Sequence, residues 1–277
     1  MEDSKKESKA KNFIKRYCNN KLAVIGFFTL VLITLIVIIA PPFLPFSEAE
    51  IDPLAFNMPP SAKHLLGGDD VGRDVLSRLL YGGRVSLAVG IFSTAVSVIV
   101  GIPLGMLAAF YRGAFEVVVM RLSDIFMSFP STILILFLVS MFGPSIITVT
   151  VVIGVLGWPK FARQIYGSVL SIREKDYIEG AVAIGAKDKL IITRYILPNA
   201  VAPIFISITF RIASAIILES SLSFLGMGVQ PPAASWGNML YNAQSITILT
   251  SRPWMWVPPG LALVTVSYTH LRAHETR

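Results

Sequence analysis

Cysteine and charge are both scarce in this chain of 277 residues. Its single cysteine, Cys18, cannot form a disulfide within the chain and leaves no Cys/His cluster for a metal ion. Charged side chains make up 15% of the sequence, whereas apolar residues make up 54%. Soluble domains carry about 25% charged residues, so the composition excludes an ordinary soluble domain. The chain is therefore predicted to be a polytopic membrane protein.

Motifs for catalysis and for nucleotide binding are also missing. The sequence has no G-x-x-x-x-G-K-[ST] phosphate loop and no HExxH, CxxC or Ser-His-Asp arrangement. Its three histidines, His64, His270 and His274, are too scattered in the sequence to suggest a site. We therefore expect a chain that is not an enzyme and that binds no nucleotide, cofactor or metal ion itself.

The basic residues follow a pattern. The net charge of +7 would by itself be compatible with a nucleic-acid partner. However, lysine and arginine cluster on alternate loops beside the apolar runs, as they do when those loops face the cytoplasm. This distribution predicts a chain embedded in membrane lipid, with no nucleic-acid partner.

Long apolar runs begin directly after a polar, basic segment at 1–21. Because about 20 helical residues cross the core of a bilayer, the run at 22–40 is predicted to be a first span. It is too long for the core of a typical signal peptide, so we expect it to be retained, with 1–21 as a cytoplasmic N-terminal tail. In total, about six transmembrane helices of an all-α protein are expected, at 22–40, 85–110, 117–142, 145–161, 200–225 and 254–266.

The last of these apolar runs is short. It stops at Val266, before the polar sequence SYTHLRAHETR, which leaves too few residues to cross a bilayer. We interpret 254–266 as an incomplete span and 267–277 as a non-native tail. A short natural last helix is the alternative.

The most ordered charged segment lies between the fourth and fifth predicted spans, at 176–199. Apolar residues from Tyr177 to Gly185 have near-helical spacing, which predicts a short amphipathic helix. Gly185 then allows the backbone to turn, and a second short helix is expected over 189–196. Pro198 either ends that helix or begins the next element. The segment is therefore predicted to be a rigid helix–turn–helix at the cytoplasmic membrane surface.

This segment resembles the EAA loop of ABC-importer permeases. The residues that match the pattern of that loop are Glu179, Ala181, Gly185, Leu197 and Pro198. Gly180 stands where the family has an alanine, which should weaken the first helix slightly. In that family the loop forms coupling helices that dock into a groove on a cytoplasmic ATPase subunit, so the resemblance implies this role here. An ordinary basic cytoplasmic loop is the alternative.

A second patterned segment, 41–84, precedes the second predicted span and is expected outside the cytoplasm. Gly67 and Gly68 predict a turn, and Asp69 or Asp70 is expected to cap a short amphipathic helix. The segment resembles the peptide and nickel branch of the same permeases at Asp69, Asp70, Gly72, Arg73 and Asp74. These residues either shape the outer mouth of a translocation path or form a purely structural connection.

Charged residues inside the predicted spans need a reason, because each charge costs about 2.5–3.5 kcal/mol at the centre of a helix. Arg211 and Glu219 belong to the fifth predicted span and are too far apart along the helix to pair with each other. Each either lines a translocation path or bonds to a neighbouring helix. Asp124, in the third predicted span, is expected to form an ion pair with Arg121 on the same helix face. A relay group on a translocation path is the alternative for Asp124.

The resemblance covers residues 10–266 and implies the fold of a type I ABC-importer permease, similar to the second permease of dipeptide and oligopeptide systems. It also implies a bacterial inner-membrane location. The implied partners are a homologous permease, two cytoplasmic ATPase subunits that use ATP, and an extracytoplasmic substrate-binding protein. Nickel chelates and glutathione are alternative substrates within the family. Two other classes stay open: a carrier or channel driven by an ion gradient, and a membrane scaffold that transports nothing.

Overall fold

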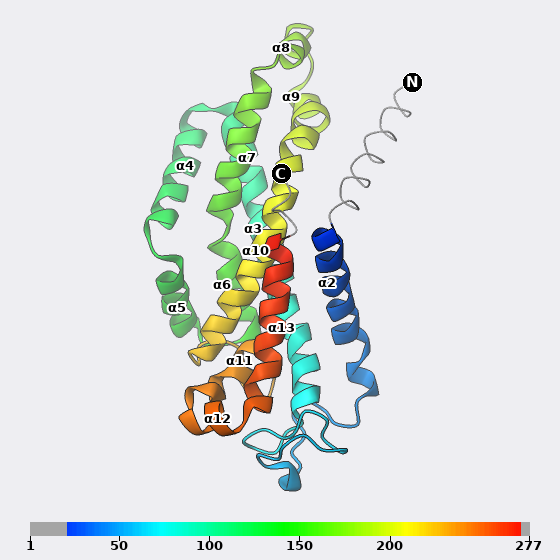
Figure 1. Ribbon diagram of the computed structural model, residues 1–277. Coiled ribbons are helices and arrows are strands. Elements are labelled where there is room, and N and C mark those ends of the chain that lie inside the picture. The colour runs from blue at the N-terminus through cyan, green and yellow to red at the C-terminus, as the bar shows by residue number, and fades with distance from the viewer. Residues whose placement is uncertain (1–20, 273–277) are drawn as a thin grey trace. The chain divides into compact units, whose positions relative to one another are not determined.

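The computed structural model describes residues 21–272 (Figure 1). Segment 1–20, with Cys18 and most of the expected cytoplasmic tail, lies outside the described residues, as do residues 273–277. Within 21–272 the regular structure is helical, with only isolated β-bridges such as Ile51 with Arg73. The prediction of an all-α polytopic membrane protein is confirmed. The chain divides into two compact units: residues up to Val85 with those from Pro231 onward, and Ser86–Gln230.

The first unit contains the first and last helices of the described chain. Within it, α13 contacts both α2 and α11. α2 ends at Ile39, shortly before Pro41 and Pro42, which lack the backbone N–H groups that would continue its hydrogen bonds. The elements of this unit are α2 (Lys21–Ile39), η1 (Pro41–Phe43), η2 (Pro53–Ala55), the start of α3 (Val75–Tyr111), α11 (Trp236–Tyr241), η4 (Asn242–Gln244), α12 (Ile246–Ser251) and α13 (Pro253–Arg272).

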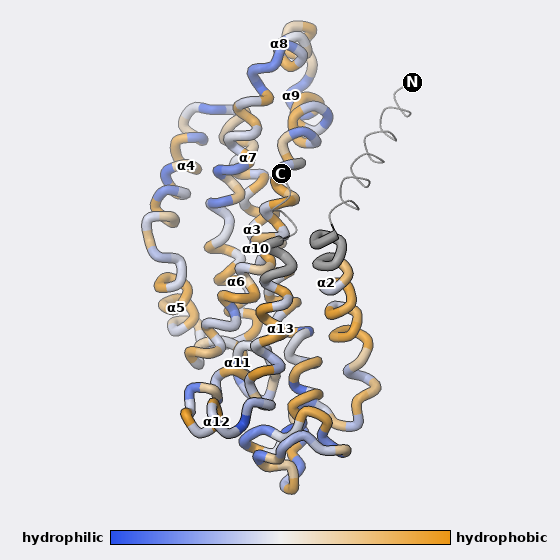
Figure 2. Tube along the Cα trace, in the orientation of Figure 1, coloured by the Kyte–Doolittle hydropathy of each residue, from blue (hydrophilic) through white to orange (hydrophobic). Residues whose placement is uncertain are grey.

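The second unit contains the rest of α3 and the helices that follow it. Figure 2 shows mostly hydrophobic residues along α5 and α6, and hydrophilic residues at the junction of α7 and α8. The further elements of this unit are α4 (Gly113–Ser128), α5 (Ser131–Phe142), α6 (Ile146–Val155), α7 (Trp158–Arg173), α8 (Asp176–Ala183), α9 (Asp188–Leu190), the π-helical turn η3 (Ile191–Ile196) and α10 (Leu197–Phe224).

Three stretches of the described chain are long and apolar enough to cross a membrane as helices: Val75–Tyr111, Ile146–Arg173 and Pro203–Phe224. A fourth is obtained if the bent pair α4 and α5 is one span. Helices α2, with 19 residues, and α13, with 20 residues, are close to the length of about 20 residues that a bilayer requires. The count of six spans stays a prediction.

Helices of the second unit approach one another at small residues of α3. A Cβ atom added at Gly101 would lie 2.6 Å from the carbonyl oxygen of Trp158, and one added at Gly105 would lie 2.1 Å from that of Ala162. Both distances are far below van der Waals contact, so α3 and α7 touch backbone to backbone. Small residues permit this close approach, which drives helix association where lipid surrounds the helices.

The predicted continuous span at 117–142 is divided in the structure. α4 ends at Ser128, and α5 begins at Ser131 after a bend of 89°. Phe129 is extended, with φ −92° and ψ 142°, because Pro130 sterically disfavours a helical conformation at the residue before it. Pro130 also lacks the N–H that would continue the helical hydrogen bonds. The apolar run is therefore two helices of different direction.

Several helices are longer than the apolar runs that predicted them. α3 begins at Val75 rather than at residue 85, and α7 ends at Arg173 rather than at residue 161. The additional turns of α7 bury one face through Ile165, Val169 and Ile172, whereas the opposite face carries polar side chains. α13 likewise continues to Arg272, past the end expected at residue 266. The predicted bounds follow the fully apolar runs of the sequence, so they miss the amphipathic turns at the ends of these helices.

Candidate functional site

The segment 176–199 has the predicted helix–turn–helix shape (Figure 1, at α8 and α9). Gly185 ends the first helix with a positive φ of +76°. The N–H of Gly185 donates to the carbonyl of Val182 (2.9 Å), and the N–H of Ala186 donates to the carbonyl of Ala181 (3.0 Å). This pair of bonds is a Schellman motif, whose left-handed residue is usually glycine because a Cβ atom is unfavourable there. Gly185 thus fixes the angle between the two halves of the segment.

The second half leads directly into α10. α9 and η3 together cover Asp188–Ile196, close to the predicted helix over 189–196, and Leu197 follows as the first residue of α10. Pro198 lies in the first turn of α10, where its missing N–H would have no helical partner. Of the two alternatives for Pro198, the structure therefore has the one in which it begins the next element.

One face of the segment is anchored in the core of the second unit. Ile178 and Ala181 of α8, together with Ile191 and Ile196 of η3, are buried in the cluster that also contains Ile165 of α7. At the base, Nη1 of Arg173 donates to the carbonyl of Ala109 (3.3 Å), and the guanidinium lies 5.7 Å from the ring centre of Phe110. The segment is thus held against α7 and α3.

The opposite face projects apolar side chains into the surroundings. Ile184 is 86% exposed, Val182 is 59% exposed and Tyr177 is 46% exposed. Glu179 is also exposed and lies in the first turn of α8, where a negative charge interacts favourably with the helix dipole. A rigid protrusion with an apolar tip is suited to bind another protein. Among the residues that match the EAA pattern, Glu179, Gly180, Gly185 and Pro198 are exposed, Leu197 is half-buried and Ala181 is buried.

Asp124 does not pair with Arg121, and that prediction is wrong. The carboxylate of Asp124 on α4 forms an ion pair with the guanidinium of Arg163 on α7. Glu116, also on α4, accepts a hydrogen bond from the hydroxyl of Tyr166 on α7. The contacts between neighbouring helices, which the sequence alone does not reveal, replace the pair expected within one helix.

We expect the pair of Asp124 with Arg163 to contribute little stability. The side chains are 45% and 44% exposed, and such ion pairs contribute about 0–1 kcal/mol. A double-mutant cycle of Asp124→Asn with Arg163→Gln, measured by thermal unfolding in detergent, should give a small coupling energy in this range. The same cycle with Arg121→Gln should give none. Coupling to Arg121 alone would contradict the assignment.

Glu219 is fully buried within the second unit and is surrounded by hydroxyl groups. Oγ of Ser86 donates to Oε2 (3.0 Å), Oγ of Ser220 donates to the same oxygen (3.3 Å), and Oγ of Ser223 donates to Oε1 (2.7 Å). A buried carboxylate is tolerated when hydrogen bonds satisfy it in this way. Glu219 therefore joins α10 to α3.

Arg211 also bonds to a neighbouring helix. Its Nη2 donates to the carbonyl of Ile153 in α6 (2.7 Å). The two charged residues of α10 thus contact different partners within the second unit.

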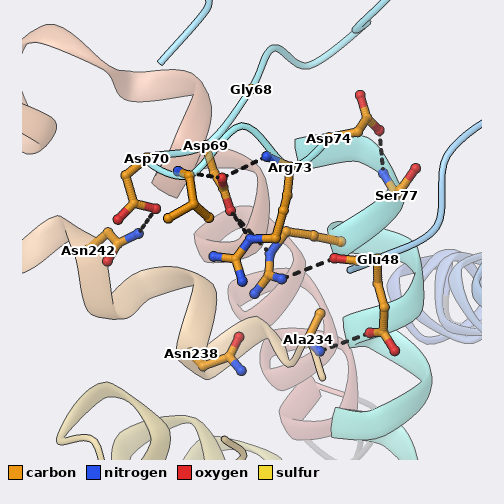
Figure 3. Close-up of polar contacts among 12 residues, drawn as sticks. Glu48, Gly68, Asp69, Asp70, Arg73, Asp74, Ser77, Ala234, Asn238 and Asn242 are labelled. Carbon is orange, nitrogen blue, oxygen red and sulfur yellow. Dashed lines mark hydrogen bonds and ion pairs between the residues drawn. The ribbon is translucent and has the colours of Figure 1, made fainter. Parts of the chain in front are cut away.

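The outer segment is organised by Asp69 (Figure 3). Oδ1 of Asp69 accepts the N–H groups of Val71 and Arg73, each at 2.9 Å, and Oδ2 accepts from Nε of Arg73 at 2.7 Å. Gly72, inside this loop, has a φ of +87°, and a Cβ atom there would lie 2.5 Å from the carbonyl oxygen of Asp52. Asp69 therefore stabilises a tight turn. The prediction that Asp69 caps a helix is wrong.

Asp74 is the residue that caps the helix, and it connects α3 to a buried histidine. Its Oδ2 accepts the N–H of Ser77 in the first turn of α3 (2.7 Å). Its Oδ1 lies 2.9 Å from Nδ1 of His64, whose Nε2 lies 3.3 Å from Oδ2 of Asp52. His64 is 2% exposed and stacks on Phe46 with ring centres 4.6 Å apart. His64 is thus a site residue that sequence reasoning missed.

Asp52 completes this chain of polar contacts. Its pKa is lowered from 3.8 to about 2, first by the hydrogen bond from Nζ of Lys63 (2.5 Å) and then by the bond from the N–H of Leu54. Because the folded-state pKa is the lower one, the stabilising contribution is present above about pH 4 and is lost as the pH falls through about 2. Asp52 therefore stays ionised at every physiological pH.

Removing the carboxylate of Asp74 should destabilise the outer segment. Asp74→Ala loses the helix cap and leaves buried His64 with one polar partner fewer, so we expect a loss of about 2–3 kcal/mol. Asp70→Ala is the matched control, since the carboxylate of Asp70 accepts one hydrogen bond within residues 21–272, from Nδ2 of Asn242 (2.7 Å). Thermal unfolding in detergent should show the larger decrease for Asp74→Ala. An equal decrease for both variants would contradict the role of Asp74.

Comparison with known proteins decides the family. A sequence model described as the inner membrane component of binding-protein-dependent transport systems matches residues 101–269. The chain belongs to this family. A second model, described as the N-terminal transmembrane domain of oligopeptide transport permease C, matches residues 8–60 of this inner membrane component. The family resemblance drawn from the sequence is confirmed.

Relatives of this inner membrane component align over most of their length. A putative peptide permease protein of Brucella ovis is 39% identical over 90% of this chain and 82% of the relative. A dipeptide transport system permease protein of Alkalihalophilus pseudofirmus is 37% identical over 91% of this chain and 82% of the relative. A glutathione transport system permease protein of Pectobacterium atrosepticum is 38% identical over 91% of this chain and 84% of the relative.

A solved structure supports the fold. The inward-facing MetNI methionine ABC transporter aligns with a TM-score of 0.57, covering 71% of this chain and 93% of that chain. The two sequences are 20% identical, so the match concerns the fold alone.

Proposed function

We propose that this chain is the translocating permease subunit of an ATP-driven importer for di- or oligopeptides. The observation that carries the proposal is the helix–turn–helix at 176–199, with one face buried in the core and an apolar tip exposed at Ile184. This tip docks into a groove on a cytoplasmic ATPase subunit. Closure of two ATPase subunits on ATP moves the segment, and α7 and α10 transmit the motion to the spans as a rigid-body rotation.

The partners and the orientation follow from this role. ATP is bound and hydrolysed by two separate ATPase subunits, because the chain has no phosphate-binding loop. A homologous permease forms the other wall of the path, and an extracytoplasmic binding protein delivers the substrate. The basic segments 1–21 and 176–199 face the cytoplasm of a bacterium, and the segment around Asp69 to Asp74 faces the opposite side.

Peptides are the substrate class that the relatives favour. The names of three relatives specify peptide, dipeptide and glutathione permease proteins, and glutathione is itself a small peptide. Nickel chelates are the alternative within the family. Selection of one substrate resides mainly in the binding protein.

A carrier driven by an ion gradient is the second candidate, and it needs ionisable residues that can release protons or bind ions along a path. Instead, Glu219 accepts three serine hydroxyls in a fully buried position, and Arg211 bonds to a helix carbonyl. These contacts favour a structural role for both charges. A scaffold without transport leaves the exposed tip without a function.

Uptake in proteoliposomes tests the proposal against both alternatives. The chain would be reconstituted with its homologous permease and the ATPase subunits, with the binding protein outside and a radiolabelled dipeptide mixture as the probe. We expect uptake that requires ATP on the ATPase side and does not respond to a proton or sodium gradient. Uptake by this chain alone under an ion gradient, or no uptake of any peptide by the complete complex, would overturn the proposal.

A further inference from the structure

We call the helix–turn–helix at 176–199 the coupling segment. The two helices that lead into it, α6 and α7, are interrupted between Val155 and Trp158. The N–H of Gly157 donates to the carbonyl of Gly154 (3.1 Å), not to the carbonyl of Ile153 that a regular helix would use. The carbonyl of Ile153 is consequently released from the helical pattern. A released backbone carbonyl inside a membrane protein requires another donor.

Side chains of two other helices bind the carbonyls at this break. Nη2 of Arg211, from α10, donates to the carbonyl of Ile153 (2.7 Å). Oγ of Ser97, from α3, donates to the carbonyl of Gly154 (2.7 Å). α10 and α3 therefore both bind α6–α7 at the point where its helical hydrogen-bond pattern is interrupted.

The fit at the break leaves no room for a side chain at position 157. A Cβ atom added to Gly157 would lie 2.4 Å from Nη2 of Arg211 and 2.2 Å from Oγ of Ser97. Since Gly157 has a φ of −87°, its backbone conformation is open to any residue. A Cβ atom at position 157 would therefore require the side chains of Arg211 and Ser97 to move away from the break.

The bond from Arg211 to Ile153 connects the two helical stretches on either side of the coupling segment, α6–α7 before it and α10 after it. α7 extends from the break to Arg173, about 22 Å along the helix axis, and α8 follows. α10 begins at Leu197 and reaches Arg211 about 21 Å further along. Arg211 therefore joins α10 to the end of α6 at the break, and the lengths of α7 and of α10 from the coupling segment to this contact are nearly equal.

From this arrangement we propose that Arg211 is a positioning residue, which holds the end of α6 at the break against α10, so that α6, α7 and α10 move as one body when the coupling segment moves. The proposal rests on the proposed function. The guanidinium of Arg211 is poorly suited to a purely stabilising role, since its Nε is buried without a hydrogen-bond partner among the described residues. Without the bond from Arg211 to Ile153, α7 can bend at the break, and ATP is hydrolysed without a matching movement of α6.

The test compares ATP hydrolysis with peptide uptake in the reconstituted complex. Arg211→Met removes the donor, Arg211→Lys keeps the charge but loses the planar fork, and Gly157→Ala displaces the guanidinium while leaving Arg211 intact. Arg163→Gln, on the exposed side of α7, is the matched control. For Arg211→Met and Gly157→Ala we expect ATP hydrolysis within twofold of the parent protein and at least tenfold fewer peptides imported per ATP. Arg211→Lys should be intermediate.

The double variant Arg211→Met with Gly157→Ala should import as many peptides per ATP as either single variant, because both substitutions remove the same contact. Unchanged import per ATP in Arg211→Met and Gly157→Ala, with normal import by the parent complex, would overturn this inference alone. Failure of both single variants to assemble would also overturn it, because the contact would then be needed only for folding. Absence of peptide import by the parent complex would instead overturn the proposed function.

Discussion

Gly185→Pro should abolish binding of the ATPase subunits to this chain. Proline requires a φ near −65°, whereas Gly185 has a φ of +76°. The substitution also removes the N–H that bonds to the carbonyl of Val182 and closes the helix end. The exposed tip at Ile184 would then lose its position relative to the anchored face. We expect at least a tenfold decrease in the amount of ATPase subunit that co-purifies with the permease pair.

The variants Gly185→Ala and Gly180→Ala test whether the positive φ at Gly185, rather than the addition of a side chain, decides binding. Gly185→Ala has open space around its new Cβ atom, so it should cost only the roughly 1–2 kcal/mol of a left-handed alanine and weaken binding partially. Gly180→Ala also meets no neighbouring atom, and it lies inside α8, where alanine is preferred by about 1 kcal/mol. Gly180→Ala should therefore leave binding intact. Normal co-purification of the ATPase with Gly185→Pro would show that this turn does not present the docking surface.

Gly105→Ala should strongly destabilise the second unit. The added Cβ atom would lie 2.1 Å from the carbonyl oxygen of Ala162 and 2.6 Å from Cγ2 of Ile165. The first of these atoms belongs to the backbone of α7, so the clash is relieved only by separating two helices. Overpacking of this kind costs about 1–3 kcal/mol, and we expect the upper end of that range.

Gly167→Ala is the matched control for this substitution, because it adds the same methyl group to α7 with no atom within 4 Å. It should stabilise the chain by up to about 1 kcal/mol through helix propensity. Thermal unfolding of the purified permease in detergent should therefore give changes of opposite sign for the two variants. A decrease of similar size in both would show that helix geometry, rather than the contact of α3 with α7, sets the effect.

The shape of the coupling segment was predictable because its determinants are local. Helical spacing, a glycine that adopts a positive φ, and a proline in the first turn of α10 all act over a few residues. The division of the third predicted span is local too, since Pro130 disfavours a helical Phe129. A continuous apolar run nevertheless looks the same whether the helix continues or turns by 89°.

Contacts between distant residues were not predictable. Arg121 was the only basic residue that the sequence placed near Asp124, whereas Arg163 reaches Asp124 only because α4 lies against α7. His64 has no local sequence signal for the same reason. Its partners, Asp52 and Asp74, are 12 and 10 residues away, and only the fold of the outer segment brings both carboxylates to one imidazole ring. The bonds from Arg211 and to Glu219 likewise depend on which helices are neighbours.

The most direct test of the account is cross-linking from the tip of the coupling segment. In a Cys18→Ser background, Ile184→Cys provides a single thiol at a site that is 86% exposed in the parent chain. Labelled with a photoreactive maleimide and irradiated within the assembled importer, it should form a covalent adduct with an ATPase subunit. Ile147→Cys, at a position 76% exposed and about 39 Å from Arg173 along α6 and α7, is the control and should form none. An importer that transports peptide but gives no ATPase adduct from position 184 would contradict the coupling role of this segment.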